Sequence, residues 1–127
     1  MRGAGRWLPV MVLVAALTLA GCGGSSGSAG SSPQDADQPV DIHVKIADGE
    51  VTPAGERVDV RLGQPIRLVV DSDAPDEIHV HSTPEHEFEV PAGAHGKVYE
   101  FTLNQPGVVE VELHELDEVV VSIAARP

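Results

Sequence analysis

The chain has 127 residues, of which 20 are acidic and eight are basic, so its formal net charge is −12 at pH 7. This balance argues against a nucleic acid or an anionic membrane surface as partner, because both would repel the protein. The length leaves room for one small folded domain beside an N-terminal leader.

Residues 1–21 have the three regions of an export signal. Arg2 and Arg6 supply positive charge, the stretch 8–20 is almost wholly apolar, and small residues precede Cys22. The apolar stretch is shorter than the roughly 20 residues that a membrane-spanning helix needs. We therefore predict a cleaved signal peptide, whose removal takes away two arginines and no acid and leaves a net charge of −14.

Cys22 is the single cysteine of the chain and ends the sequence Leu-Ala-Gly-Cys. This sequence resembles the lipobox of bacterial lipoprotein precursors. The resemblance implies cleavage before Cys22, a diacylglycerol on its sulfur and usually a further acyl chain, such as palmitate, on the new amino terminus. Two or three acyl chains anchor a protein stably, so the expected location is the extracytoplasmic face of the cell membrane. The alternative is an ordinary signal peptide followed by a chance cysteine.

Residues 22–39 are rich in Gly and Ser, and no large apolar side chain follows the cysteine. Such a stretch cannot bury enough surface to offset the entropy lost on ordering. We predict a flexible tether between the lipidated cysteine and a single domain at 40–127. Gly/Ser chain statistics place that domain about 20–25 Å from the membrane.

Apolar and polar residues alternate through the domain, the pattern typical of half-buried β-strands. Clusters of Gly, Pro, Asn and Asp separate the alternating segments. About seven to eight short strands, without any window of helical periodicity, predict an all-β sandwich. The strands are predicted at 41–46, 57–62, 65–71, 77–81, 86–90, 97–103, 108–114 and 118–124.

The order of these strands and turns resembles a cupredoxin-like domain. The likeness rests on RVDVRLGQPIRLVV at 57–70, VPAG at 90–93, YEFTL at 99–103 and PGVVEVELH at 106–114. It is closest to the cupredoxin-like domains of bacterial surface lipoproteins, including the type associated with iron-uptake proteins (EfeO type). The resemblance implies a Greek-key β-sandwich that spans nearly all of 40–127.

Blue-copper members of this family hold copper with two histidines, a cysteine thiolate and a weak axial methionine. The strand position that the family gives to the cysteine holds Leu113 here, and His114 follows it directly. Met1 and Met11 lie in the predicted signal, and Cys22 is the predicted lipidation site. This ligand chemistry excludes a type 1 electron-transfer centre in spite of the resemblance.

Histidines are the remaining candidates for metal ligands. His79 and His81 share one face of a predicted strand, where two imidazoles can hold one ion. His86 follows across a short loop, and the family's strand positions bring His114 to the same end. We predict a site for copper, or zinc, formed by His79, His81, His86 and His114. The alternative is that these histidines are solvated or paired with acids.

The sequence also predicts the positions of other polar residues in the domain. The family's strand positions place the carboxylates of Glu77, Glu112 and Glu115 near the same end as the candidate ligands. His43 and His95 are expected to be surface residues.

Enzymatic chemistry has little support in the sequence. The domain has no cysteine nucleophile, no Gly-x-Ser-x-Gly motif and no phosphate-binding glycine loop. Glu85, Glu87 and Glu89 could flank a scissile bond, but the alternation makes Glu87 and Glu89 the solvated face of a strand. We do not expect an enzyme.

Two functions remain open at this point. One is a surface-tethered protein that binds or buffers copper or a similar divalent ion. The other is a metal-free cupredoxin-like module that serves as an accessory or interaction domain for an unidentified membrane protein partner.

Overall fold

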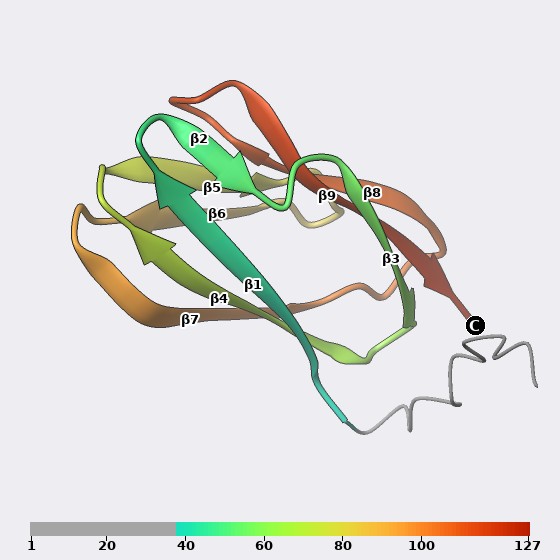
Figure 1. The fold of residues 1–127 in the computed structure, drawn as a ribbon. Coiled ribbons are helices and arrows are strands. Elements are labelled where there is room, and N and C mark those ends of the chain that lie inside the picture. Colours follow the sequence, from blue (N-terminus) through green and yellow to red (C-terminus); the bar gives the residue numbers. More distant parts are fainter. Residues whose placement is uncertain (1–37) are drawn as a thin grey trace, which may run out of the picture. The chain divides into compact units, whose positions relative to one another are not determined.

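The computed structural model describes residues 38–127, which form nine β-strands and no helix. A four-stranded sheet has the order β2-β1-β4-β7, and a five-stranded sheet has the order β3-β9-β8-β5-β6 (Figure 1). The prediction of an all-β sandwich is confirmed. The strands are β1 (Val40–Ala47), β2 (Glu50–Thr52), β3 (Glu56–Arg61), β4 (Pro65–Ser72), β5 (Asp76–Val80), β6 (His86–Val90), β7 (Ala94–Thr102), β8 (Gly107–Leu113) and β9 (Glu118–Arg126).

Three predictions concern residues that the structure does not describe. The signal peptide at 1–21, the lipidation site Cys22 and nearly all of the tether at 22–39 lie outside the described residues. Within 38–127, no helix is long and apolar enough to cross a membrane.

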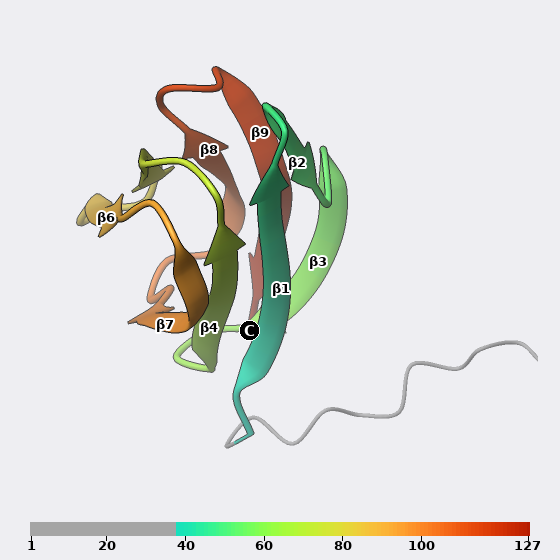
Figure 2. The same cartoon turned by 60° about the vertical axis from the view of Figure 1, so that its left-hand side comes forward.

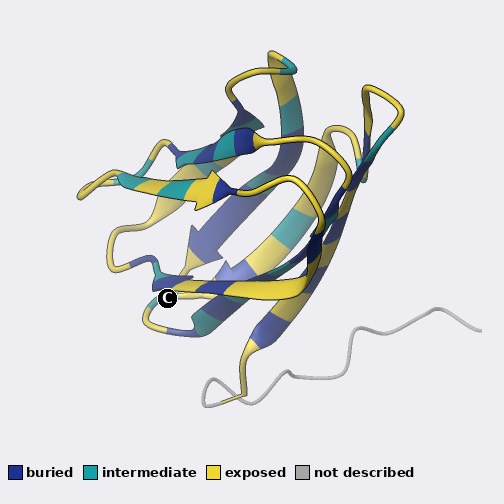
Figure 3. Ribbon diagram, turned by 90° about the vertical axis from the view of Figure 1, so that its left-hand side faces the viewer, coloured by how far each residue is buried: buried dark blue, intermediate teal, exposed yellow. Residues whose placement is uncertain are grey.

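The two sheets face each other (Figure 2). Their inner side chains form one hydrophobic core. Ile66, Leu68 and Val70 of β4 are fully buried, and so are Ile78 and Val80 of β5. The residues between them are more exposed, so the alternation in the sequence becomes an alternation in burial along each strand (Figure 3). Each sheet contains both parallel and antiparallel strand pairs. The parallel pairs are β1 with β4 and β3 with β9, and the remaining pairs are antiparallel.

The sequence pattern does not predict β2, so the count is nine strands rather than seven to eight. This strand has only three residues and pairs with the end of β1, with Ala47 opposite Glu50. Asp48 and Gly49 connect the two strands and have φ angles of 57° and 78°. Two positive φ angles in a two-residue connection are the mark of a type I′ hairpin turn. Three residues are too few for alternation to reveal a strand.

β5 lies between β6 and β8 in the five-stranded sheet and positions the candidate site. Its register with β6 pairs His79 with Glu87, and its register with β8 pairs His79 with Glu112. Residues directly opposite each other on antiparallel strands have side chains on the same face of the sheet. The outer face of β5 therefore carries a histidine with an acidic residue on either side.

Candidate metal centre

Glu77 and His79 lie on the outer face of the five-stranded sheet. Their orientation follows from the burial of Ile78 and Val80, which turns the alternate side chains of β5 outwards. The Nε2 atom of His79 is hydrogen-bonded to the Oε1 atom of Glu77. The His79 side chain is 19% exposed and that of Glu77 is 33% exposed, so both remain accessible to an ion from solvent.

His114 follows β8 and reaches the same place. Its backbone amide donates a hydrogen bond of 2.9 Å to the carbonyl oxygen of Glu77, which ties the end of β8 to β5. The ring centroids of His79 and His114 are 5.2 Å apart. One ligand atom each from Glu77, His79 and His114 lies within 4.8 Å of the others. Two imidazole nitrogens and a carboxylate oxygen thus converge at one point, and we name this group the first ligand set.

A cavity of about 370 Å³ opens beside the first ligand set. Its lining includes four acidic residues, which attract cations. The lining residues are Pro75, Asp76, Glu77, Glu89, His114 and Glu115.

The side chain of Asp76 accepts hydrogen bonds from the backbone at or next to two residues of the first ligand set. It is only 7% exposed, and its Oδ1 atom accepts hydrogen bonds from the amides of Glu77 at 2.7 Å and Glu115 at 3.0 Å. These two bonds connect the first residues of β5 with the loop that follows β8. They hold His114 in place, a role that hydrogen-bonding groups behind metal ligands commonly have.

The pKa of His79 is raised above its usual value. The hydrogen bond to Glu77 is the main cause; partial burial acts in the opposite direction, and the charges of Glu77, Glu87 and Glu85 add to the rise. A metal binds only the neutral imidazole, so protons compete with a metal for His79.

His81 lies just beyond β5, next to the first ligand set. Its Nε2 atom is 2.9 Å from Oε2 of Glu112, and its Nδ1 atom is 3.6 Å from Oε1 of Glu85. Its ring centroid is 6.2 Å from that of His79. The sequence places His79 and His81 on one face, and the structure brings them together, with Glu85 between them.

The structure does not bring His86 to this group. Its partner across β5 and β6 is the buried Val80, so His86 points to the inner face of the sheet. Its ring stacks on that of Phe88 with centroids 6.1 Å apart and lies 5.6 Å from the ring of Phe101. The structure therefore brings together three of the four predicted histidines, and aromatic packing on the inner face keeps His86 apart from them.

Glu85 and Glu87 join the group although the sequence pattern does not assign them as ligands. Glu87 is the direct partner of His79 across the two strands. One ligand atom each from His79, Glu85 and Glu87 lies within 4.8 Å of the others. We name this group the second ligand set. The alternation places Glu87 correctly on a solvated face, and only the hairpin register shows that the same face carries His79.

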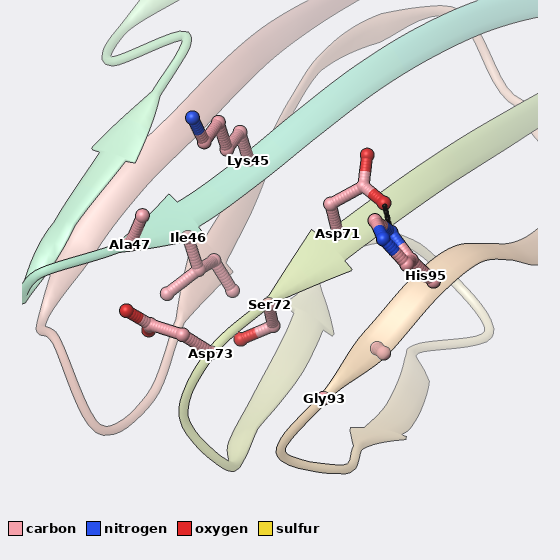
Figure 4. A pocket seen from close by; sticks show the side chains of 9 residues that line it. Lys45, Ile46, Ala47, Asp71, Ser72, Asp73, Gly93 and His95 are labelled. Carbon is pink, nitrogen blue, oxygen red and sulfur yellow. Dashed lines mark hydrogen bonds and ion pairs between the residues drawn. The ribbon is translucent and has the colours of Figure 1, made fainter.

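A second cavity, of about 290 Å³, lies on the other sheet near the ends of β1, β4 and β7 (Figure 4). On its rim the Nδ1 atom of His95 is 2.6 Å from Oδ1 of Asp71, which also accepts a bond from the amide of Gly96 at 3.0 Å. The bond to His95 is the main reason that the pKa of Asp71 is lowered. Within the described domain no third ligating side chain joins this pair. His95 and His43 are both exposed.

The sulfur ligands of a blue-copper centre are not present in the described domain. Residues 38–127 contain neither cysteine nor methionine. Leu113, which occupies the position that the cupredoxin resemblance gives to the cysteine, is fully buried in the core. The residues present therefore do not fit a thiolate-bound copper, whereas the first ligand set offers nitrogen and oxygen.

No family model matches the chain, and no curated protein is significantly similar to it. Solved structures do match. The metal-binding domain of the Streptococcus pneumoniae D39 Cu(I)-exporting P-type ATPase CopA, solved with Cu(I), has a TM-score of 0.54 and 17% identity, with 70% of this chain and 87% of that chain covered. A copper-binding protein in its apo form has a TM-score of 0.53 and 22% identity, with 69% and 88% covered.

A purple cupredoxin from Nitrosopumilus maritimus is also similar, with a TM-score of 0.49 and 17% identity over 68% of this chain and 99% of that chain. Identities this low show the fold alone. The two structures with TM-scores of 0.53 and 0.54, together with the two sheets described above, show that the described domain is a cupredoxin-like β-sandwich.

Proposed function

We propose that the protein is a membrane-anchored lipoprotein whose cupredoxin-like domain binds a divalent transition metal ion at the extracytoplasmic face. The observation that carries the metal assignment is the convergence of Glu77, His79 and His114, with ligand atoms within 4.8 Å of one another. His81 lies beside this set, 6.2 Å from His79 between ring centroids.

Ligand type supports Cu(II), with Zn(II) as the second choice. Imidazole nitrogen suits both ions, and Cu(II) heads the affinity order for divalent metals at such sites. Cu(I) prefers soft sulfur ligands, and residues 38–127 contain none. Two of the similar structures are described by the copper that they bind, one of them as Cu(I), so they support copper as the element and say nothing for the Cu(II) state.

The proposed role is binding rather than electron transfer or catalysis. Without a thiolate or thioether in the described domain, a copper ion at this site lacks the trigonal sulfur-containing geometry of electron-transfer centres. Acidic residues around the cavity would favour capture or buffering of cations.

The proposed location at the membrane depends on Cys22. The Leu-Ala-Gly-Cys sequence after an apolar stretch supports lipidation, and the Gly/Ser-rich residues that follow support a tether. An anchored metal-binding domain would present its ion to a membrane protein partner, which is the partner class that we propose.

Metal titration tests the proposed function. The purified protein is stripped with a chelator and titrated with Cu(II) and, separately, Zn(II) by calorimetry. We expect binding that His79→Ala and His114→Ala each weaken by roughly tenfold or more, the scale at which even supporting residues act in metal sites. His43→Ala is the matched control, because His43 is exposed on β1 in the other sheet. Absence of binding, or equal affinity in all variants, would refute the proposal.

One observation favours the second candidate function, a metal-free interaction module. His79 and His81 already have carboxylate partners in Glu77 and Glu112, so an ion is not needed to satisfy either ring. Metal analysis of the protein as purified from its native membrane separates the two functions, because the interaction module would carry no stoichiometric metal.

A further inference from the structure

The two ring nitrogens of His79 face different groups of ligands. Nε2 is bonded to Glu77, which belongs to the first ligand set. Nδ1 faces the other way, 3.9 Å from Oε1 of Glu85 in the connection between β5 and β6. The two nitrogens of an imidazole are chemically distinct sites that point away from each other. A single side chain therefore separates two places where metal ligands gather.

The second ligand set is held by the fold and is more than an acidic surface. Glu87 is fixed opposite His79 by the register of β5 and β6. Glu85 lies between two imidazoles, with Oε1 3.9 Å from Nδ1 of His79 and 3.6 Å from Nδ1 of His81. The carboxylates thus converge on imidazole nitrogens, which is the donor combination that Cu(II) and Zn(II) accept.

Charge also favours two ions rather than one. The residues on and around the two sets include four carboxylates, those of Glu77, Glu85, Glu87 and Glu112, and within 38–127 no lysine or arginine forms an ion pair with any of them. One divalent ion in the first ligand set would leave Glu85 and Glu87 as close neighbours without a cation between them. A second divalent ion would reduce their mutual repulsion.

We propose that His79 bridges two divalent metal ions, one bound through Nε2 with Glu77 and His114, and the other bound through Nδ1 with Glu85 and Glu87. The first ion is that of the proposed function, on which this inference rests. When the second ion binds, the remaining N–H proton of the ring is released to solvent, so that the bridging group is an imidazolate. The domain then holds a pair of ions on the outer face of β5.

Stoichiometry and magnetic coupling test the bridge. The purified, metal-stripped protein is loaded with Cu(II), counted by native mass spectrometry and measured by electron paramagnetic resonance. We expect two ions per chain and a weaker resonance signal per copper once the second ion binds, because two Cu(II) ions on one imidazolate couple magnetically. His79→Ala should lose both ions, His114→Ala should lose the first, and Glu85→Gln/Glu87→Gln should lose only the second.

Glu50→Gln/Glu100→Gln is the matched control, because it removes two exposed carboxylates from the other sheet. It should keep two coupled ions. One ion per chain that still depends on His79 and His114 would overturn the bridge and leave the proposed function intact. Two uncoupled ions, of which His79→Ala removes only one, would also overturn the bridge. Absence of any bound ion would overturn both the bridge and the proposed function.

Discussion

The buried carboxylate of Asp76 accepts a hydrogen bond of 3.0 Å from the backbone amide of Glu115, a residue 39 positions later in the chain. The same oxygen accepts a second bond, of 2.7 Å, from the amide of Glu77. One side chain thereby joins the start of β5 to the loop after β8. This junction reinforces the bond from the His114 amide to the Glu77 carbonyl oxygen, which brings His114 beside β5.

Asp76→Ala should therefore weaken both the fold and the metal site. The substitution leaves two partly buried amides without their acceptor, so we expect the free energy of unfolding to fall by about 1–3 kcal/mol. The affinity for Cu(II) should fall by about 10- to 100-fold, as when other supporting groups behind metal ligands are removed. Chemical denaturation and calorimetric titration measure the two effects.

Asp73→Ala is the matched control for Asp76→Ala. Asp73 is an exposed aspartate nearby in sequence that accepts one hydrogen bond of 2.9 Å, from the amide of Asp48. We expect a smaller loss of stability and no change in Cu(II) affinity. Equal Cu(II) affinity in the Asp76→Ala and Asp73→Ala proteins would show that Asp76 does not position His114.

The raised pKa of His79 gives opposite pH dependences for folding and for metal binding. The protonated His79 paired with Glu77 stabilises the metal-free fold. This contribution is complete below the ordinary histidine pKa of about 6.5 and is lost as the pH rises through the raised pKa of the folded state. Metal binding needs the neutral ring, so the affinity for Cu(II) should increase over the same interval.

Nuclear magnetic resonance titration of the His79 ring in metal-free protein measures this pKa directly. Glu77→Gln should move the pKa back towards its usual value and flatten the dependence of the unfolding free energy on pH, because the main cause of the rise is removed. An unshifted His79 pKa in the unsubstituted protein, or a shift that survives Glu77→Gln, would contradict this prediction.

Most of the fold could be predicted from the sequence because burial on one face of a strand leaves a period of two. The segments around Leu68 and Ile78 show this pattern clearly, and both residues are fully buried. β2 was not predicted, because three residues are too few to show a period of two. The dipeptide Asp48-Gly49 was the available signal, since Asp-Gly is a preferred sequence for a type I′ turn.

The candidate site could be predicted only in part, because a sequence shows which residues share a strand face but not how neighbouring strands align. The alternation alone predicts that His79 and His81 lie on the same face of the predicted strand. Glu87 needed the register, because only the pairing of β5 with β6 shows that it lies opposite His79. The alternation alone separates His86 from Glu87, and His86 lies on the inner face, opposite the buried Val80.

The turn that defines β2 gives a stability prediction. Gly49 has a φ angle of 78°, and its added Cβ would meet nothing within 4 Å, so strain rather than crowding decides the effect of a substitution. We expect Gly49→Ala to lower the free energy of unfolding by about 1–2 kcal/mol. Asp48→Asn is the matched control and should have little effect, because Asn tolerates a positive φ as well as Asp does. Equal stabilities of the two variants would contradict the prediction.

Cys22→Ala should release the protein from the membrane without altering its metal site. In the proposed function, anchoring rests on acyl chains at Cys22, and the sequence has no other cysteine to carry one. We expect loss of labelled palmitate and a shift from the membrane to the soluble extracytoplasmic fraction, with unchanged Cu(II) affinity, because Glu77, His79 and His114 lie in the described domain. Ser25→Ala, in the predicted tether, is the control and should remain anchored. Palmitate labelling and membrane attachment that persist in the Cys22→Ala protein would rule out lipidation at this residue.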